Sequence, residues 1–173
     1  MAQQPILRLG NRGLRVRCTR VRAFGTEALT TLVRDLDDTL AAWQREHGFG
    51  RAIAAPQIGV AQRVIVTRTD GPPVLVNPVI TRRSRTRMVL WDDCFSMPTL
   101  VVKVRRHLSL DLRYQDEGGR SHQLHVRGAL AELLQHEIDH LDGVLAIDRA
   151  IDSRHIVYRE EQERWRDSSR LVM

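Results

Sequence analysis

The chain has 173 residues, of which 42% are hydrophobic and 28% charged, a balance typical of a soluble protein with a buried core. No apolar run approaches the roughly 20 residues that a membrane-spanning helix needs, so we expect no membrane partner. The formal net charge of +6 permits contact with a ribosome surface. The sequence contains no zinc finger, aromatic-basic ribonucleoprotein motif or P-loop, so we expect no recognition of a specific nucleic-acid sequence.

The beginning of the chain is rich in arginine. The first 22 residues hold six arginines and no acidic residue, a composition that transit peptides share. Apolar and basic residues alternate over residues 14–17, however, which suits an extended segment better than an amphipathic helix. We therefore expect a cytoplasmic protein with a single domain over residues 1–173. Two cysteines, Cys18 and Cys94, are too few for a disulfide framework.

The predicted elements begin with an irregular or extended segment at residues 5–22. Thr26 can cap a helix that runs to about Glu46, because apolar residues recur there at helical spacing. Gly48 and Gly50 end this helix, and residues 51–59 are expected to form a loop or a short extended segment. Apolar runs then predict strands at residues 63–68, 74–76, 88–90, 100–104, 108–114 and 122–126.

The second half of the chain contains a hairpin signal and two further helices. Asp-Glu-Gly-Gly at residues 116–119 is typical of a hairpin turn between the last two predicted strands. Residues 129–141 are expected to form a helix, and Asp152 can cap a final charged helix to about Arg166. The order predicts an α+β fold with mixed or antiparallel sheets packed around the helix at residues 129–141, and with N-terminal and C-terminal helices.

The helix predicted at residues 129–141 carries an H-E-x-x-H motif. His136 and His140 are four residues apart, so both imidazoles leave the same helical face and can bind one divalent ion. Glu137 lies between them, where its carboxylate can reach a water molecule at the ion without being a ligand. The same five residues also fit an exposed helix with a chance spacing, and two imidazoles require a third ligand from elsewhere.

Cys94 is the candidate for the third ligand. It follows a predicted strand, and the intervening hairpins can fold it back toward the helix. A thiolate with two imidazoles suits zinc or ferrous iron and leaves a coordination position open. Taken alone, Cys94 fits an inert buried thiol better.

Three segments together resemble the peptide deformylase family. They are R-A-I-A-A-P-Q-I-G at residues 51–59, W-D-D-C-F-S-M-P at residues 91–98 and Q-H-E-I-D-H-L-D-G at residues 135–143, in the family's order and at its rough spacing. Shorter matches extend over most of the chain. The third segment matches closely, whereas the first two contain changes.

The resemblance implies removal of the N-formyl group from formyl-methionyl peptides of nascent proteins, which releases formate. Glu137 would act as general base and then as general acid, while the side-chain amide of Gln57 and the backbone N–H of Phe95 would hold the formyl oxygen. Arg51 and Ala52 would lie along the substrate, and a methionine pocket would include Leu133. Fe2+ would be the cellular metal, with Zn2+, Ni2+ or Co2+ able to replace it, and the ligands would be Cys94, His136 and His140.

Two segments depart from the family pattern. Ala52 stands where an ungapped match places a glycine, unless Gly48 and Gly50 form the glycine pair. Asp93 replaces a glycine before Cys94, where a positive φ would strain the backbone. Asp92 replaces a glutamate, and Arg106 is a candidate partner for its shorter side chain.

Three alternatives remain open from the sequence. One is a deformylase-like enzyme that acts on another small formylated substrate. A zinc endopeptidase is a second, although the short chain leaves little room for a long cleft. The third is a catalytically weak, metal-stabilised protein that makes transient contact with ribosomes through its arginine-rich surface.

Overall fold

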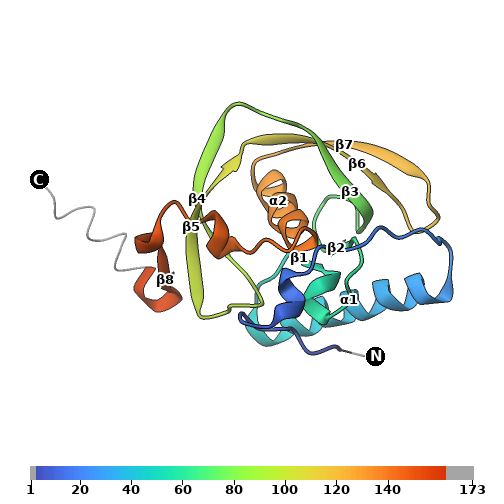
Figure 1. The fold of residues 1–173 in the computed structure, drawn as a ribbon, viewed down its shortest axis with the longest axis horizontal. Helices are drawn as coiled ribbons and strands as arrows, with labels where there is room; N and C mark the ends of the chain where they lie inside the picture. The colour runs from blue at the N-terminus through green and yellow to red at the C-terminus, as the bar shows by residue number, and fades with distance from the viewer. Residues whose placement is uncertain (1–2, 163–173) are drawn as a thin grey trace, which may run out of the picture.

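Two antiparallel sheets enclose one helix in the computed structural model, which describes residues 3–162 (Figure 1). The central helix is α2 (Ala129–Leu141). The larger sheet has the strand order β1 (Ala52–Ala54), β2 (Val64–Thr67), β3 (Val74–Arg83), β6 (Ser109–Gln115) and β7 (Ser121–Arg127). The smaller sheet has the order β4 (Arg87–Asp93), β5 (Leu100–His107) and β8 (Ile156–Tyr158). This architecture confirms the predicted α+β fold.

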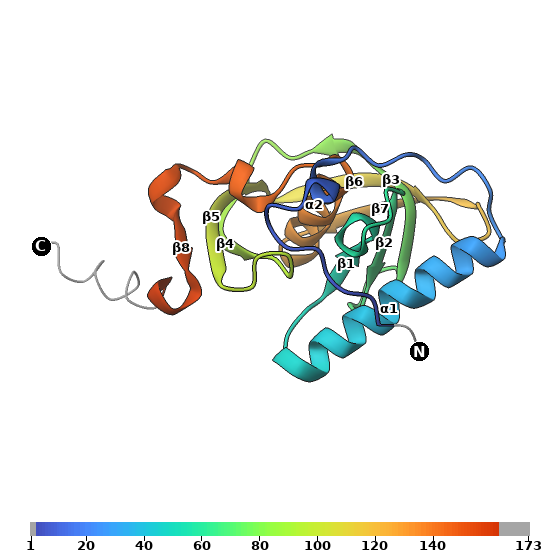
Figure 2. The ribbon, with the colours of Figure 1, turned by 60° about the horizontal axis from the view of Figure 1, so that its bottom comes forward.

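Helix α1 (Glu27–His47) runs along one side of the molecule next to β1 and β2 (Figure 2). The Thr26 side chain accepts a hydrogen bond from the Leu29 N–H, as expected of an N-cap, and Gly48 ends the helix with a left-handed φ of 75°. Its apolar stripe, which includes Leu36 and Leu40, is buried against the larger sheet. The helix predicted between Thr26 and Glu46 is thus confirmed.

Helix α2 has the predicted bounds, and it is buried along almost its whole length. Every residue from 131 to 141 is buried, the polar ones included. Leu134, Ile138 and Leu141 pack against apolar residues of the larger sheet. An amphipathic surface helix would bury only one stripe. The polar face of α2 therefore lies in the protein interior, where each polar group requires a partner.

The six predicted strands correspond to β2–β7 and lie at their predicted positions, but not all of their lengths agree. Strand β3 continues to Arg83, well past the predicted end at residue 76, because its exposed second half pairs with β6 and needs no apolar residues there. Strand β1 was expected only as a loop or short extended segment. The hairpin at residues 116–119 joins β6 to β7, and Gly119 takes a φ of 84° in its turn.

The helix predicted to begin after Asp152 is wrong in its first part. Asp152 caps only a 3-10 turn, Ser153–His155, and strand β8 follows. The β8 residues Ile156, Val157 and Tyr158 have high strand propensity and complete the smaller sheet by pairing with β5. Helical residues begin only at residue 159, and the predicted helix beyond residue 162 lies outside the described residues.

None of the helices in residues 3–162 is both long and apolar enough to cross a membrane.

Gly143 lies two residues after the end of the H-E-x-x-H helix, and its conformation and its packing both require glycine. Its φ is +73°, and a Cβ placed on it would lie 2.5 Å from the carbonyl oxygen of Arg15. The N-terminal segment passes over the end of α2 at this point, where the Cys18 N–H donates to the Leu141 carbonyl at 2.9 Å. Gly143 thus permits close packing of two backbones.

We predict that Gly143→Ala destabilises the protein by about 3 kcal/mol, because a left-handed alanine costs about 1 kcal/mol and overpacking adds about 2 kcal/mol. Gly25→Ala is the matched control, since Gly25 has a φ of +63° but nothing within 4 Å of the methyl group that alanine would add. Urea unfolding of both variants measures the difference. Equal destabilisation would contradict the role assigned to the Arg15 contact.

Candidate metal centre

The three predicted ligands converge at one buried point. The ligand atoms of Cys94, His136 and His140 all lie within 4.8 Å of one another. Cys94 Sγ is 3.2 Å from His140 Nε2, and the two Nε2 atoms of the histidines are also 3.2 Å apart. All three residues are at most 5% exposed. The arrangement therefore has the donors and the spacing of a metal site.

The elements that carry the ligands are joined by hydrogen bonds and pairing. Cys94 comes directly after β4, which pairs with β5 over its whole length. On α2, the Gln135 side chain makes two hydrogen bonds to the backbone of His107, at the end of β5. Its Oε1 accepts from the His107 N–H and its Nε2 donates to the His107 carbonyl, both at 2.9 Å. These contacts fix α2, and with it both imidazoles, relative to the strand pair that positions Cys94.

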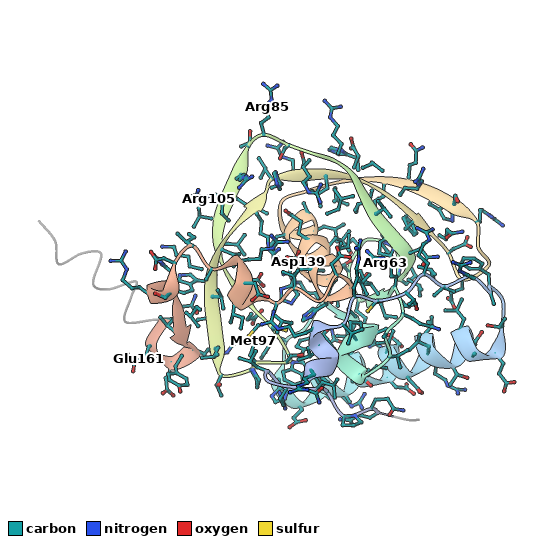
Figure 3. All side chains as sticks on the ribbon, viewed as in Figure 1. Arg63, Arg85, Met97, Arg105, Asp139 and Glu161 are labelled. Atoms are coloured by element: carbon teal, nitrogen blue, oxygen red, sulfur yellow. The ribbon has the colours of Figure 1, made fainter. Side chains whose placement is uncertain are left out.

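A buried charge network orients His136. Nδ1 of His136 lies 2.8 Å from Oδ1 of Asp92, and the other oxygen of Asp92 accepts from Arg106 Nη2 at 2.8 Å. Arg106 also donates to Asp139, which lies in the interior in Figure 3, whereas Arg105 projects outward. The predicted Asp92–Arg106 contact is confirmed. Because Asp92 occupies Nδ1, the Nε2 atom of His136 is left to face the other ligands.

The electrostatics of the network suit a cation. Burial alone would raise the pKa of Asp92, but His136 and Arg106 hold it well below its usual range. Asp92 in turn raises the pKa of His136 well above its usual value, against the opposing effect of burial. For His140, burial and the neighbouring His136 lower the pKa well below its usual value, so its imidazole is neutral. The centre thus stabilises positive charge at Nε2 of His136, where either a proton or a metal ion can bind.

The residues fit a resident metal ion. A thiol and two imidazoles are the donor set preferred by zinc and ferrous iron. Their ligand atoms already converge, and Asp92 supports His136 in the way that carboxylates support metal-bound histidines. Oε2 of Glu137 is also buried and has no hydrogen-bond partner within residues 3–162. A buried, unpartnered carboxylate oxygen next to such a donor set is typical of a site that binds a water molecule.

A pocket of about 700 Å³ opens onto this centre. Glu137 lies on its wall and is 3% exposed, and burial is the main cause that raises the pKa of its carboxyl group to about 7. The pocket also brings together two ligands and all the predicted substrate residues: Cys94, His136, Arg51, Ala52, Gln57, Phe95 and Leu133.

Gln57 and Phe95 present hydrogen-bond donors beside Cys94. Oε1 of Gln57 accepts from the Ala54 N–H at 2.9 Å, which turns its Nε2 toward Cys94 Sγ, 3.7 Å away, and Ser96 Oγ, 3.5 Å away. The Phe95 backbone N–H finds no acceptor among the described residues. The Phe95 ring stacks on Trp43 with a centroid distance of 4.6 Å, so this residue is held rigidly.

The strain expected at Ala52 and Asp93 is wrong. Ala52 lies in β1 and Asp93 in β4, and of the non-glycine residues in the described part of the chain only Asn77 has a positive φ. Gly48 and Gly50 take φ values of 75° and 126° instead. A Cβ on Gly50 would lie 2.7 Å from Phe95 Cζ. The positions that require glycine are therefore Gly48 and Gly50, and not Ala52.

Sequence reasoning missed two charged residues of the pocket. Glu132 precedes His136 by one helical turn, a spacing that could have placed it beside the ligands. Burial, followed by the charge of Asp92, raises the pKa of Glu132, and Arg51 opposes that shift. Arg159 follows β8 and binds Asp93 at 3.0 Å. No signal in the sequence pointed to Arg159, because its segment was expected to be a solvated helix and not part of a pocket.

We predict that Asp92→Asn weakens metal binding 10- to 100-fold, because the His136 ring loses the carboxylate that orients it. Competition between the metal-free protein and a chromophoric chelator for Zn2+ or Co2+ measures the change. Asp93→Asn is the matched control, since Asp93 is adjacent in sequence but its exposed carboxylate binds, among residues 3–162, only Arg159. Equal loss in both variants would contradict the assigned role of Asp92.

Comparisons with known proteins agree with this geometry. Residues 3–155 match the family model described as polypeptide deformylase. A curated relative, "Peptide deformylase 1" of Prochlorococcus marinus (strain MIT 9313), is 37% identical over 175 residues, which cover 94% of this chain and 88% of the relative.

Solved structures show the same fold. The crystal structure of a peptide deformylase from Thermotoga maritima aligns with a TM-score of 0.80 at 31% identity, over 88% of this chain and 100% of the other. A peptide deformylase from Synechococcus elongatus in complex with actinonin aligns with a TM-score of 0.80 at 34% identity, over 90% of this chain and 84% of the other. The chain therefore belongs to the polypeptide deformylase family.

Proposed function

We propose that the chain removes the N-formyl group from formyl-methionyl peptides of nascent proteins and releases formate, with one divalent metal ion held by Cys94, His136 and His140. The observation that carries the assignment is the position of Glu137. Its carboxylate is buried, has an unpartnered oxygen within the described residues, and shares a pocket with two of the ligands, Cys94 and His136. Hydrolysis of an amide requires a proton carrier at this place, whereas metal binding alone does not.

The ligand set indicates which metals fit. One thiolate and two imidazoles suit Fe2+, which we propose as the cellular metal, and Zn2+, Ni2+ or Co2+ can use the same donors. When bound, such an ion acts as a Lewis acid that polarises a carbonyl group and lowers the pKa of water.

Glu137 manages the proton in the proposed reaction. Its carboxylate takes a proton from the water molecule whose oxygen attacks the formyl carbon. When the carbon–nitrogen bond breaks, Glu137 returns that proton to the leaving amine of the methionyl peptide, and formate remains. A pKa near 7, raised mainly by burial, suits both steps, because the group can accept and release a proton at neutral pH.

Gln57 and Phe95 stabilise the charge that develops on the formyl oxygen. The Gln57 amide is fixed by its bond to Ala54, and the Phe95 backbone is fixed by the stacking of its ring and by the Arg8 bond to its carbonyl at 2.7 Å. Donors that are already in place need no reorganisation during the reaction and contribute about 3 kcal/mol each. Leu133 contributes apolar surface for the methionine side chain.

Location and partners follow from this activity. A nascent formylated peptide is presented at the ribosome in the cytoplasm, and the net charge of +6 supports transient contact with ribosomal RNA. A binding protein without turnover was favoured by strain at Ala52 and Asp93, and neither residue has a positive φ.

We predict that Glu137→Gln retains one metal ion per chain but loses about 1,000-fold in kcat/KM, because the amide cannot carry the proton. Formate release from formyl-Met-Ala-Ser is measured with protein prepared in Fe2+ without oxygen, and metal content is measured in parallel. Glu117→Gln, on the hairpin between β6 and β7, is the control. A fully active Glu137→Gln protein would refute the proton role, and loss of metal would show that Glu137 supports the ligands instead.

A further inference from the structure

An ion pair lies on the pocket wall one helical turn from the metal ligands. Glu132 is four residues before His136 on α2, so its side chain lies on the same helical face. Its Oε2 accepts from Arg51 Nη2 at 2.7 Å, and Arg51 Nη1 also donates to the Ala129 carbonyl at 3.2 Å. The pair lines the same pocket as Glu137 and the candidate ligands Cys94 and His136.

Both residues line the pocket, and Arg51, not Glu132, is the exposed member of the pair. The side chain of Arg51 is 46% exposed, whereas that of Glu132 is 8% exposed. A guanidinium has five N–H donors, and within the described residues Arg51 uses two of them. The remaining donors are available to an acceptor on a bound molecule, and Glu132 and Ala129 hold the group in position to offer them.

The part of the wall that Arg51 forms gives an aliphatic substrate side chain little benefit, so the methionine side chain of the proposed substrate uses the apolar surface beside it. Leu133 and Ala52 provide apolar surface nearby, but a methylene chain laid against Arg51 would remove water from the free N–H groups without replacing its hydrogen bonds. A carboxylate would replace those bonds with charge-assisted ones. Arg51 therefore favours a substrate group that accepts hydrogen bonds over an aliphatic one.

The negative charge of Glu132 does not prevent a second carboxylate from binding Arg51. Arg106 in the same protein binds two carboxylates at once, those of Asp92 and Asp139, through different N–H groups. Elsewhere on the pocket lining, Arg159 binds Asp93, and its guanidinium lies 5.1 Å from the Phe49 ring centroid. Glu132 and Asp93 are therefore both already paired with an arginine.

We propose that Arg51 is a specificity-determining residue that binds a carboxylate on the formylated residue of the substrate. The carboxylate is either an acidic side chain or the free α-carboxylate of an N-formyl amino acid, such as N-formylmethionine. Glu132 is the positioning residue for the guanidinium. This inference rests on the proposed deformylation and names a substrate class for it.

Paired substrates test the proposal and distinguish the two sources of the carboxylate. N-formylmethionine is compared with its amide, and formyl-Glu-Ala amide with formyl-norleucyl-Ala amide, by formate release. We expect the carboxylate member of at least one pair to have a kcat/KM at least tenfold higher. Arg51→Leu removes this preference, so that the carboxylate member and the uncharged member of each pair are expected to have the same kcat/KM within a factor of two.

Three further variants test whether the loss of preference in Arg51→Leu comes from the lost carboxylate contact and not from misfolding or a general change in charge. Arg51→Leu leaves Glu132 buried without its arginine, so the double variant with Glu132→Leu removes both charges and should also lose the preference. Arg51→Lys should restore part of it, since the positive charge is kept. Arg68→Leu breaks the Arg68–Asp37 ion pair between β2 and α1, outside the pocket, and should leave the preference unchanged.

Binding to the Glu137→Gln protein separates this inference from the proposed function. Calorimetry in that background measures the affinity for the same four compounds without turnover. Formate release with no carboxylate preference in either pair would overturn the inference and leave deformylation standing. Absence of formate, together with carboxylate binding that Arg51→Leu weakens tenfold, would support the inference and refute deformylation. Equal binding of all four compounds without formate would overturn both.

Discussion

The buried guanidinium of Arg106 makes the contacts on which the geometry of the candidate metal centre depends. It extends from β5 to Asp92 on β4 and to Asp139 on α2, so a single side chain joins the three elements that carry or support the ligands. Removing one member of such a group leaves a buried charge without a partner and costs about 3 to 5 kcal/mol. Through Asp92 the guanidinium orients the His136 ring, and Cys94 follows Asp92 by two residues. The ligand positions and the fold are therefore maintained by the same interactions.

The burial of α2 explains why so many of its polar residues have defined partners. A helix enclosed on several sides cannot turn its histidines and acids toward water, so each one must bind another group or remain reactive. Gln135 binds the His107 backbone, and Asp139 binds Arg106 and Arg149. Within the described residues, Oε2 of Glu137 and Nδ1 of His140 have no such hydrogen-bond partner, and of the two residues only Glu137 carries a carboxylate. The interior satisfies the structural polar groups and leaves the proposed proton carrier free.

Local rules predicted the features that depend on local geometry. The spacing of His136 and His140 brings both rings together in any α-helix, and the bounds of α2 followed from the same periodicity. Cys94 could be joined to them only through the family resemblance, because hairpin packing sets that distance. Strand β8 was missed since pairing with β5 outweighs the helical tendency of its charged neighbours. Strain at Ala52 and Asp93 was wrongly expected, because a motif alignment does not fix φ.

The separation of the ligands along the chain has a consequence for the order of folding. Cys94 follows a strand of the smaller sheet, whereas both histidines belong to a helix packed on the larger sheet. Of the three ligands, a partly synthesised chain that ends before α2 has only the thiol, and a chain whose sheets have not yet come together has the two histidines of α2 without the thiol. The complete three-ligand site therefore forms late, after both sheets have closed around α2. Metal bound by all three ligands would in this way stabilise only molecules whose tertiary structure is already complete.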